Sequence, residues 1–368
     1  MKRRSNLINT NRYAYLRLLR FARNDLFGTF YEFIIIYNGQ NFFGIKGVIM
    51  NILIYGGGAV GLGIASCLLK SGAQIDIIGR EDTVLSLQRD GLVRHGIFGD
   101  YSSGPEMFGS FVSLEDIPPR IYDYILVCTK SFDSETAAKD ISSHGSILDQ
   151  GTKIILFQNG WGNAEIFIHV FPKRQIYNAR VITGFSRPKP NEVVITVHAD
   201  AIHIGSLFLQ DVSGVNDLCG SITRGDIPCE INEHIERDIW AKMLYNCALN
   251  PLGAILNVPY GKLGEYEYTR VIMEGIVKEI FKVIGRGGYK THWESPEDYL
   301  KIFYERLLPP TALHESSTLQ DIRARKRTEI DALNGAIVEL AGKFKIEIPF
   351  NRLVYNLVKF MEIRNLTT

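Results

Sequence analysis

The sequence Asn51–Gly61 reads NILIYGGGAVG. Its first five residues form an apolar run typical of a buried strand, and its glycines follow the pattern G-x-G-x-x-G. Residues 62–71 then predict a helix that ends before Gly72, and residues 74–78 predict a second strand. A strand, a glycine turn, a helix and a second strand within about 30 residues indicate a dinucleotide-binding unit of the Rossmann type.

Each glycine of this motif has a distinct physical task. Gly56 permits the tight turn after the strand, Gly58 lets backbone N–H groups approach a pyrophosphate, and Gly61 lets the helix pack closely on the strand. Ala59 and Val60 lie between them, at the start of the helix, whose positive end faces the phosphates. We therefore expect these five residues to bind the cofactor.

The end of the second strand favours NADP(H) over NAD(H). NAD-binding units usually place an Asp or Glu there for the ribose 2′-hydroxyl, whereas this strand is followed by Arg80, which suits a 2′-phosphate. Glu81 and Asp82 come next, and either can be the ribose partner if the register is shifted by one residue.

Further strands are predicted over residues 124–128 and 153–157. Lys130 and Asn159 follow their carboxyl ends, which is where ligands bind in open α/β sheets, although both residue types are also common in ordinary turns. Residues 193–197 and 201–205 predict an antiparallel hairpin at the far edge of the same sheet.

From about residue 232 a helical period replaces the strand pattern. We predict helices over the ranges 233–250, 264–286, 296–306, 316–344 and 350–363, with Pro251 among the residues that end them. The predicted organisation is α/β, with a Rossmann-type domain over residues 50–230 and an all-helical domain over 231–368.

Lys242, Asn246 and Asn250 form a polar stripe at i, i+4 and i+8 on the first of these helices. Their neighbours are mainly apolar, so a lysine and two amides are expected in a buried setting where they need partners. A polar ligand in a cleft would supply those partners; a solvent-facing stripe is the alternative.

A second candidate set comprises Ser317, Asp321 and Glu329. On one continuous helix over 316–344 these residues share a face that suits a hydroxylated substrate. They can equally form ion pairs within the helix, with arginines at 323, 325 and 327.

Charge and cysteine content bound the other possibilities. The chain of 368 residues has a net charge of +1, so we expect no nucleic-acid partner. Residues 1–49 carry +6 and the remainder −5, so we expect the first 49 residues to be a basic extension outside the fold. Five widely spaced cysteines predict no metal site and a reducing, cytoplasmic setting. No apolar run is long enough to predict a membrane span.

Together these segments resemble the ketopantoate reductase (2-dehydropantoate 2-reductase) family over residues 50–365. The resemblance is carried by the glycine motif, by Cys128-Thr129-Lys130 and Gln158-Asn159-Gly160, and by the helical segments that contain Lys242 and Glu329. It implies NADPH-dependent reduction of 2-dehydropantoate to pantoate, on the route to pantothenate and coenzyme A, and a homodimer as a family-level expectation.

The resemblance also implies residue roles. Lys242 matches the general acid that protonates the carbonyl oxygen, and Glu329 matches an active-site glutamate. The substrate-contacting positions are Asn246, Asn250 and Ser317, and the cofactor-side positions are Lys130, Asn159 and Arg80.

One departure affects substrate choice. His314 stands where well-known family members have an asparagine that helps to hold the substrate. Reduction of another branched 2-oxo acid therefore stays open, as does a non-catalytic NADP(H)-binding sensor on the same fold. A dehydrogenase acting on a phosphate ester is disfavoured, since no extra basic cluster is evident.

Overall fold

The computed structural model describes residues 50–209 and 211–367. The predicted extension over residues 1–49 lies outside the described residues. The strands are β1 (Asn51–Tyr55), β2 (Gln74–Ile78), β3 (Leu92–Gly96), β4 (Tyr101–Ser103), β5 (Gly109–Phe111), β6 (Tyr124–Val127), β7 (Lys153–Leu156), β8 (Ile176–Lys189), β9 (Glu192–Gly205) and β10 (Cys229–Ile231).

These strands form one sheet in the order β4-β3-β9-β8-β7-β6-β1-β2-β5, with β10 alongside β9. Strands β7, β6, β1 and β2 run parallel, and the chain reverses its direction of progress across the sheet between β1 and β6. Ligands of open α/β sheets bind at such a reversal, beyond the carboxyl ends of the strands. The predicted dinucleotide-binding fold is confirmed.

The predicted hairpin over residues 193–205 is wrong. These residues form one strand, β9, whose antiparallel partner is β8, and β9 lies inside the sheet rather than at its edge. The polar residues His198 and Asp200, which lie between the two predicted strands, bond across the pair to Thr183 and Arg180. Register shifts along β8 let the long pair curve without breaking.

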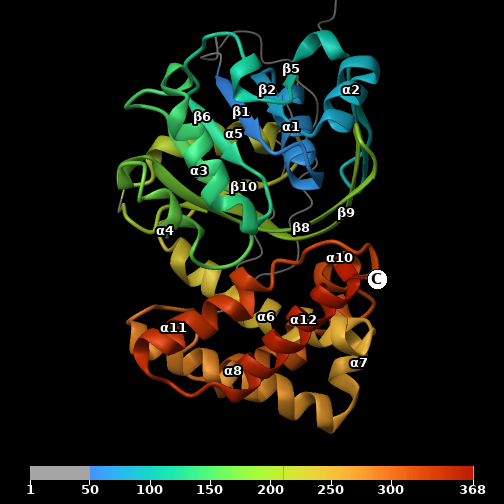
Figure 1. Ribbon diagram of the computed structural model, residues 1–368, viewed down its shortest axis with the longest axis vertical. Coiled ribbons are helices and arrows are strands. Elements are labelled where there is room, and N and C mark those ends of the chain that lie inside the picture. The colour runs from blue at the N-terminus through green and yellow to red at the C-terminus, as the bar shows by residue number, and fades with distance from the viewer. Residues whose placement is uncertain (1–49, 210, 368) are drawn as a thin grey trace, which may run out of the picture. The chain divides into compact units, whose positions relative to one another are not determined.

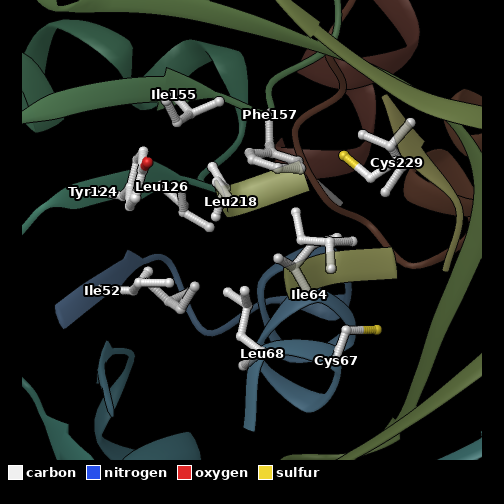
Figure 2. Close-up of a cluster of buried hydrophobic side chains, with 14 of the residues drawn as sticks. Ile52, Ile64, Cys67, Leu68, Tyr124, Leu126, Ile155, Phe157, Leu218 and Cys229 are labelled. Carbon is white, nitrogen blue, oxygen red and sulfur yellow. The ribbon is translucent and has the colours of Figure 1, made fainter. Parts of the chain in front are cut away.

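Each face of the sheet buries its own apolar layer. Along β1, Ile52 and Ile54 belong to one cluster, while Leu53 and Tyr55 belong to the other, as the two-residue period of a strand requires. In the first cluster, Ile64 and Leu68 of helix α1 (Ala59–Lys70) pack on the strands (Figure 2). The outcome is a glycine loop and helix α1 held rigidly at the end of β1.

Helices cover the rest of the sheet region. They are α1, α2 (Glu81–Asp90), α3 (Ser134–Ser143), α4 (Asn163–Phe167) and α5 (Asn216–Arg224). Four of the five cysteines are buried, and Cys128 is partly buried.

The second region is helical, as predicted, and has its own core around Trp240, Leu244 and Ile280. Its helices are α6 (Ile235–Leu256), α7 (Tyr260–Glu265), α8 (Glu267–Gly287), α9 (Pro296–Ile302), α10 (Ser317–Arg323), α11 (Ala336–Phe344) and α12 (Pro349–Thr367). They pack together as one group (Figure 1). No helix within the described ranges combines the length and apolarity that a membrane crossing needs.

Helix α6 does not end at Pro251, contrary to the prediction. It continues to Leu256 with the proline inside it. A proline lacks the N–H that would bond to the carbonyl four residues earlier, here that of Cys247. The buried Asn334 donates to that carbonyl at 3.2 Å instead, so a side chain from a distant segment replaces the missing donor.

The predicted helix over residues 316–344 is also wrong. Helix α10 ends at Arg323, and Arg325 has a φ of 54°, in the left-handed region that terminates helices. An irregular segment follows, then a π-helical turn over Asp331–Gly335 and helix α11. The irregular segment is anchored by Thr328, whose N–H and hydroxyl both donate to the buried Glu362.

Candidate active site

The glycine loop has the geometry that its motif predicts. Gly56 has a φ of 119°, and a Cβ there would lie 2.8 Å from backbone atoms of Cys128 and Thr129. A Cβ on Gly61 would lie 2.0 Å from the carbonyl oxygen of Gly56. A Cβ on Gly58 would meet nothing within 4 Å, so this glycine borders open space at the start of α1. The loop therefore fits a dinucleotide pyrophosphate at Gly58.

Two arginines lie beside this loop. Arg80 is exposed and immediately precedes helix α2, after the end of β2, as predicted. Arg187, near the end of β8, donates to the carbonyl of Gly57 at 3.2 Å and to the hydroxyl of Thr83 at 2.8 Å. Sequence reasoning missed Arg187, because β8 was not predicted and no local pattern relates residue 187 to residue 57.

Lys242 on helix α6 reaches across to the sheet region. Its Nζ donates to Oδ1 of Asn159 at 2.6 Å and to the carbonyl of Val181 at 2.7 Å. Nδ2 of Asn159 in turn donates to Oε2 of Glu329 at 3.1 Å. Three residues predicted separately from distant segments are thus joined in one hydrogen-bonded chain.

Glu329 is buried and has further donors on its other side. Its Oε1 accepts from the N–H of Ser131 at 3.3 Å, and Nζ of Lys130 lies 3.4 Å from Oε2. Lys130 also donates to Asp321 at 3.0 Å. The four-residue network of Lys130, Asn159, Lys242 and Glu329 therefore links the carboxyl ends of two strands to the helical region.

The two lysines of this network experience opposite electrostatic shifts. Burial, and to a lesser extent the charge of Arg180, lower the pKa of Lys242 to about 8, against a smaller opposing effect of Glu329. For Lys130, burial also favours the neutral form, but Glu329 and Asp321 outweigh it and raise the pKa. Lys242 is thus the lysine that can lose a proton near neutral pH.

Asp321 and Glu329 both contact Lys130, but not because they lie on one face of a single helix, as predicted. Because the chain turns away after Arg323, Asp321 and Glu329 do not share a helix face, and Ser317 is an exposed residue in the first turn of α10. The alternative of ion pairs within one helix is also wrong for these two carboxylates, since both pair with Lys130.

The three residues of the polar stripe on α6 lie in two different surroundings. Lys242 and Asn246 line a small cavity of about 20 Å³ together with Asn159. Asn250 is buried deeper, and its Oδ1 accepts a hydrogen bond of 2.5 Å from the hydroxyl of Tyr260. The expectation that buried amides need partners is met for Asn250 by a tyrosine of the protein itself.

Family models and curated relatives match most of the described chain. The model of ketopantoate reductase PanE/ApbA matches residues 52–207, and the model of its C-terminal region matches residues 234–362. A 2-dehydropantoate 2-reductase of Aquifex aeolicus is 34% identical over 320 residues, which cover 87% of this chain and 99% of that protein. The chain belongs to the ketopantoate reductase family. The resemblance and the fold class inferred from the motifs are both confirmed.

Other members of the ketopantoate reductase family agree. A 2-dehydropantoate 2-reductase of Pyrococcus horikoshii is 30% identical over 322 residues, covering 85% of this chain and 98% of that protein. The crystal structure of a PanE/ApbA family ketopantoate reductase from Ralstonia eutropha JMP134 superimposes with a TM-score of 0.74 at 27% identity. It is matched along its whole length and covers 86% of this chain.

One position of interest within this ketopantoate reductase fold is His314. It is exposed just before α10, and its ring lies 5.2 Å from that of Tyr260, centroid to centroid. Tyr260 in turn donates a hydrogen bond to Asn250, so Tyr260 connects His314 to Asn250. A side chain at position 314 can therefore influence the deeper end of the α6 stripe.

Proposed function

We propose that this protein reduces 2-dehydropantoate to pantoate with NADPH, as a step of pantothenate and coenzyme A biosynthesis. The observation that carries the proposal is the hydrogen-bonded chain from Lys242 through Asn159 to Glu329. It presents one lysine of lowered pKa beside a cavity, within a family whose relatives bear the name of this reaction.

In the proposed reaction, NADPH held at the glycine loop would supply the hydride that forms the new C–H bond at C2 of the substrate, whose carbonyl becomes an alcohol. Nζ of Lys242 donates its proton to the carbonyl oxygen as negative charge develops there. The lysine must then recover a proton from solvent or a neighbouring group. Since its pKa is about 8, most of the population is protonated at neutral pH, and proton loss is not prohibitive.

Asn159 and Glu329 orient the lysine. The Asn159 amide accepts from Lys242 through its oxygen and donates to Glu329 through its nitrogen, so the carboxylate fixes which way the amide faces. Lys130 neutralises part of the charge of Glu329. We propose Asn246, Asn250 and Ser317 as substrate contacts, with Asn250 already committed to Tyr260.

The cofactor is proposed to lie along the glycine loop. Gly58, Ala59 and Val60 offer the first N–H groups of α1 to the pyrophosphate, and Arg80 pairs with the 2′-phosphate that distinguishes NADPH from NADH. Lys130 and Asn159 border the nicotinamide end. Two domains divided near residue 231, a homodimer and a cytoplasmic location complete the proposal.

The test is oxidation of NADPH, followed by absorbance, in the presence of 2-dehydropantoate. We expect the full chain to turn over and Lys242→Met to lose about 10²–10⁴-fold in kcat. The matched control is Lys262→Met, because Lys262 is an exposed lysine of the helical region that pairs only with Glu265 in the described contacts. Equal activity of the two variants would reject Lys242 as the acid.

A second substrate is favoured by one observation. His314 replaces the asparagine expected near the substrate and contacts Tyr260. Another branched 2-oxo acid would be reduced by the same residues, so the assay should include 2-oxoisovalerate and 2-oxo-3-methylvalerate. The higher kcat/KM identifies the substrate.

A further inference from the structure

Arg180 is a buried cation beside Lys242 that neither the motifs nor the proposed mechanism uses. It belongs to β8, its side chain is 4% exposed, and it lines the same cavity as Lys242 and Asn246. The next residue, Val181, provides the carbonyl that accepts from Lys242. Two cationic side chains therefore border one small cavity.

The guanidinium of Arg180 is satisfied on one side only. Its Nη2 donates to Oδ2 of Asp200 at 2.6 Å and lies 2.6 Å from Nδ1 of His203 and 3.5 Å from Asp238. Its Nη1 is buried and has no hydrogen-bond partner within the described part of the chain. An unpaired N–H of a buried charged group is costly, so its retention calls for a partner.

The side of the Arg180 guanidinium that carries Nη2 is held in place by the contacts of Asp238. Asp238 also accepts from Asn232 at 2.6 Å and contacts His203 at 2.5 Å and His292 at 2.7 Å. These contacts fix the carboxylate that faces Nη2, and hence the plane of the guanidinium. The free Nη1 is thus presented in a defined direction rather than on a mobile side chain.

Two unpaired acceptors belong to the same cavity. Oε1 of Gln158 and Oδ1 of Asn178 are buried without hydrogen-bond partners among the described residues, and both side chains line the cavity with Arg180. One unpaired donor and two unpaired acceptors together suit a ligand that carries both an anionic group and a hydroxyl.

We propose that Arg180 binds the carboxylate of the 2-oxo-acid substrate through Nη1, while Lys242 faces the adjacent carbonyl oxygen. This inference rests on the proposed function and assigns a specificity-determining residue to it. A 2-oxo acid carries its carboxylate and carbonyl on neighbouring carbon atoms, so two cations at one cavity match its two oxygen-bearing groups.

The electrostatics of Lys242 support this assignment. The charge of Arg180 is, after burial, the second contribution that lowers the pKa of Lys242. A carboxylate bound to Arg180 would offset part of that effect and favour the protonated, proton-donating form of the lysine. Substrate binding and the readiness of the acid would then be coupled through one arginine.

The experiment compares 2-dehydropantoate with its neutral primary amide as substrates of the full chain. For Arg180→Gln we expect KM for the acid to rise about 30-fold, the size of one lost charge-assisted hydrogen bond, with KM for NADPH within about twofold of wild type. The neutral amide should lose less than about threefold, because it makes no ion pair with Arg180. Equal losses for acid and amide would show a structural role and overturn the proposal.

Two further variants keep the test interpretable. Arg180→Lys retains a charge for Asp200 but has no second nitrogen, so we expect it to fold and still lose about tenfold in KM for the acid. Arg94→Gln is the matched control, since Arg94 is a fully buried arginine paired with Asp226, away from the cavity. It should not discriminate between acid and amide.

A binding measurement separates this proposal from the proposed function. If the wild-type chain reduces no 2-oxo acid, the proposed function fails, and pantoate binding is then measured by calorimetry with NADP⁺ present. Weaker binding of pantoate to Arg180→Gln than to wild type and Arg94→Gln supports the arginine as a carboxylate site. Equal binding, or none, refutes it.

Discussion

The side-chain amide of Asn159 donates to Glu329 at 3.1 Å while it accepts from Lys242 at 2.6 Å. Asn159 follows a strand of the sheet, whereas Glu329 comes from an irregular segment of the helical region 170 residues later. The amide therefore transmits the position of a carboxylate in one region to an ammonium in the other. Substitution of Glu329 or of Lys242 itself should therefore change the pH dependence of catalysis in a direction that the contacts predict.

The pH dependence of catalysis should report Lys242. Its pKa is about 8 and its protonated form is the donor, so kcat/KM should be highest below that pH and fall about tenfold per unit above it. In Lys242→Arg the group stays charged at all accessible pH values, so activity should be low and this alkaline fall absent. An unchanged alkaline fall in that variant would assign it to another group.

Glu329→Gln should lower activity and move the alkaline fall to lower pH. The charge of Glu329 raises the pKa of Lys242, so its removal lowers that pKa further, and the donating form is lost sooner as pH rises. We expect kcat to drop about 10–100-fold, because the amide contact to Asn159 is weakened. Glu339→Gln, at an exposed carboxylate of α11, is the control and should leave the profile in place.

Arg80→Ala should change cofactor preference rather than catalysis. Loss of a guanidinium from a 2′-phosphate should raise KM for NADPH about 10–100-fold and leave KM for NADH within about twofold. Arg89→Ala removes an exposed arginine of α2, the helix that follows Arg80, where it pairs with Asp90, and should change neither KM. Steady-state kinetics with NADPH and with NADH measures both KM values. An equal rise of KM for both cofactors would show that Arg80 does not bind the 2′-phosphate.

Substitutions at two glycines of the loop should affect protein stability and cofactor binding separately. Gly61→Ala places a Cβ 2.0 Å from the Gly56 carbonyl and should lower the free energy of unfolding by about 1–3 kcal/mol. Gly58→Ala adds a methyl group in open space, so the melting temperature should hold while the Kd for NADPH rises about tenfold. Thermal melts and a fluorescence titration measure both; intact NADPH affinity in Gly58→Ala would place the pyrophosphate elsewhere.

Tyr260→Phe tests whether Asn250 is primarily structural. The change leaves the buried Oδ1 of Asn250 without its donor and should cost about 1–3 kcal/mol of unfolding free energy. Tyr268→Phe, at a side chain that is 84% exposed, should cost almost nothing. If Tyr260→Phe is as stable as the control but binds substrate poorly, Asn250 acts on the ligand instead.

Local signals explain what the sequence predicted well. The glycine motif, strands β1, β2, β6 and β7, and the helical nature of the second region all follow from patterns within about 30 consecutive residues. Lys242, Glu329 and Asn159 were selected as candidate site residues because their motifs occur together in the family. In the structure the three side chains lie in direct hydrogen-bond contact.

The failures share one physical cause, which is tertiary contact between distant segments. Helix α6 passes through Pro251 because Asn334 replaces a lost donor, and β9 stays extended because β8 pairs with its polar residues. Arg180 and Arg187 gain significance only from partners more than 20 residues away, apart from the nearby Asp200. No glycine or proline marks the end of α10 at Arg323 or the left-handed backbone at Arg325.

The interruption after α10 has a consequence for anyone who would engineer this enzyme. Residues 324–330 contain no helix breaker, and a continuous helix through them is what their own preferences support. Substitutions chosen to strengthen local helicity would therefore pull Glu329 out of reach of Asn159. Thermostabilisation by consensus or design should spare this stretch, since a more regular backbone here would break the contact between Glu329 and Asn159.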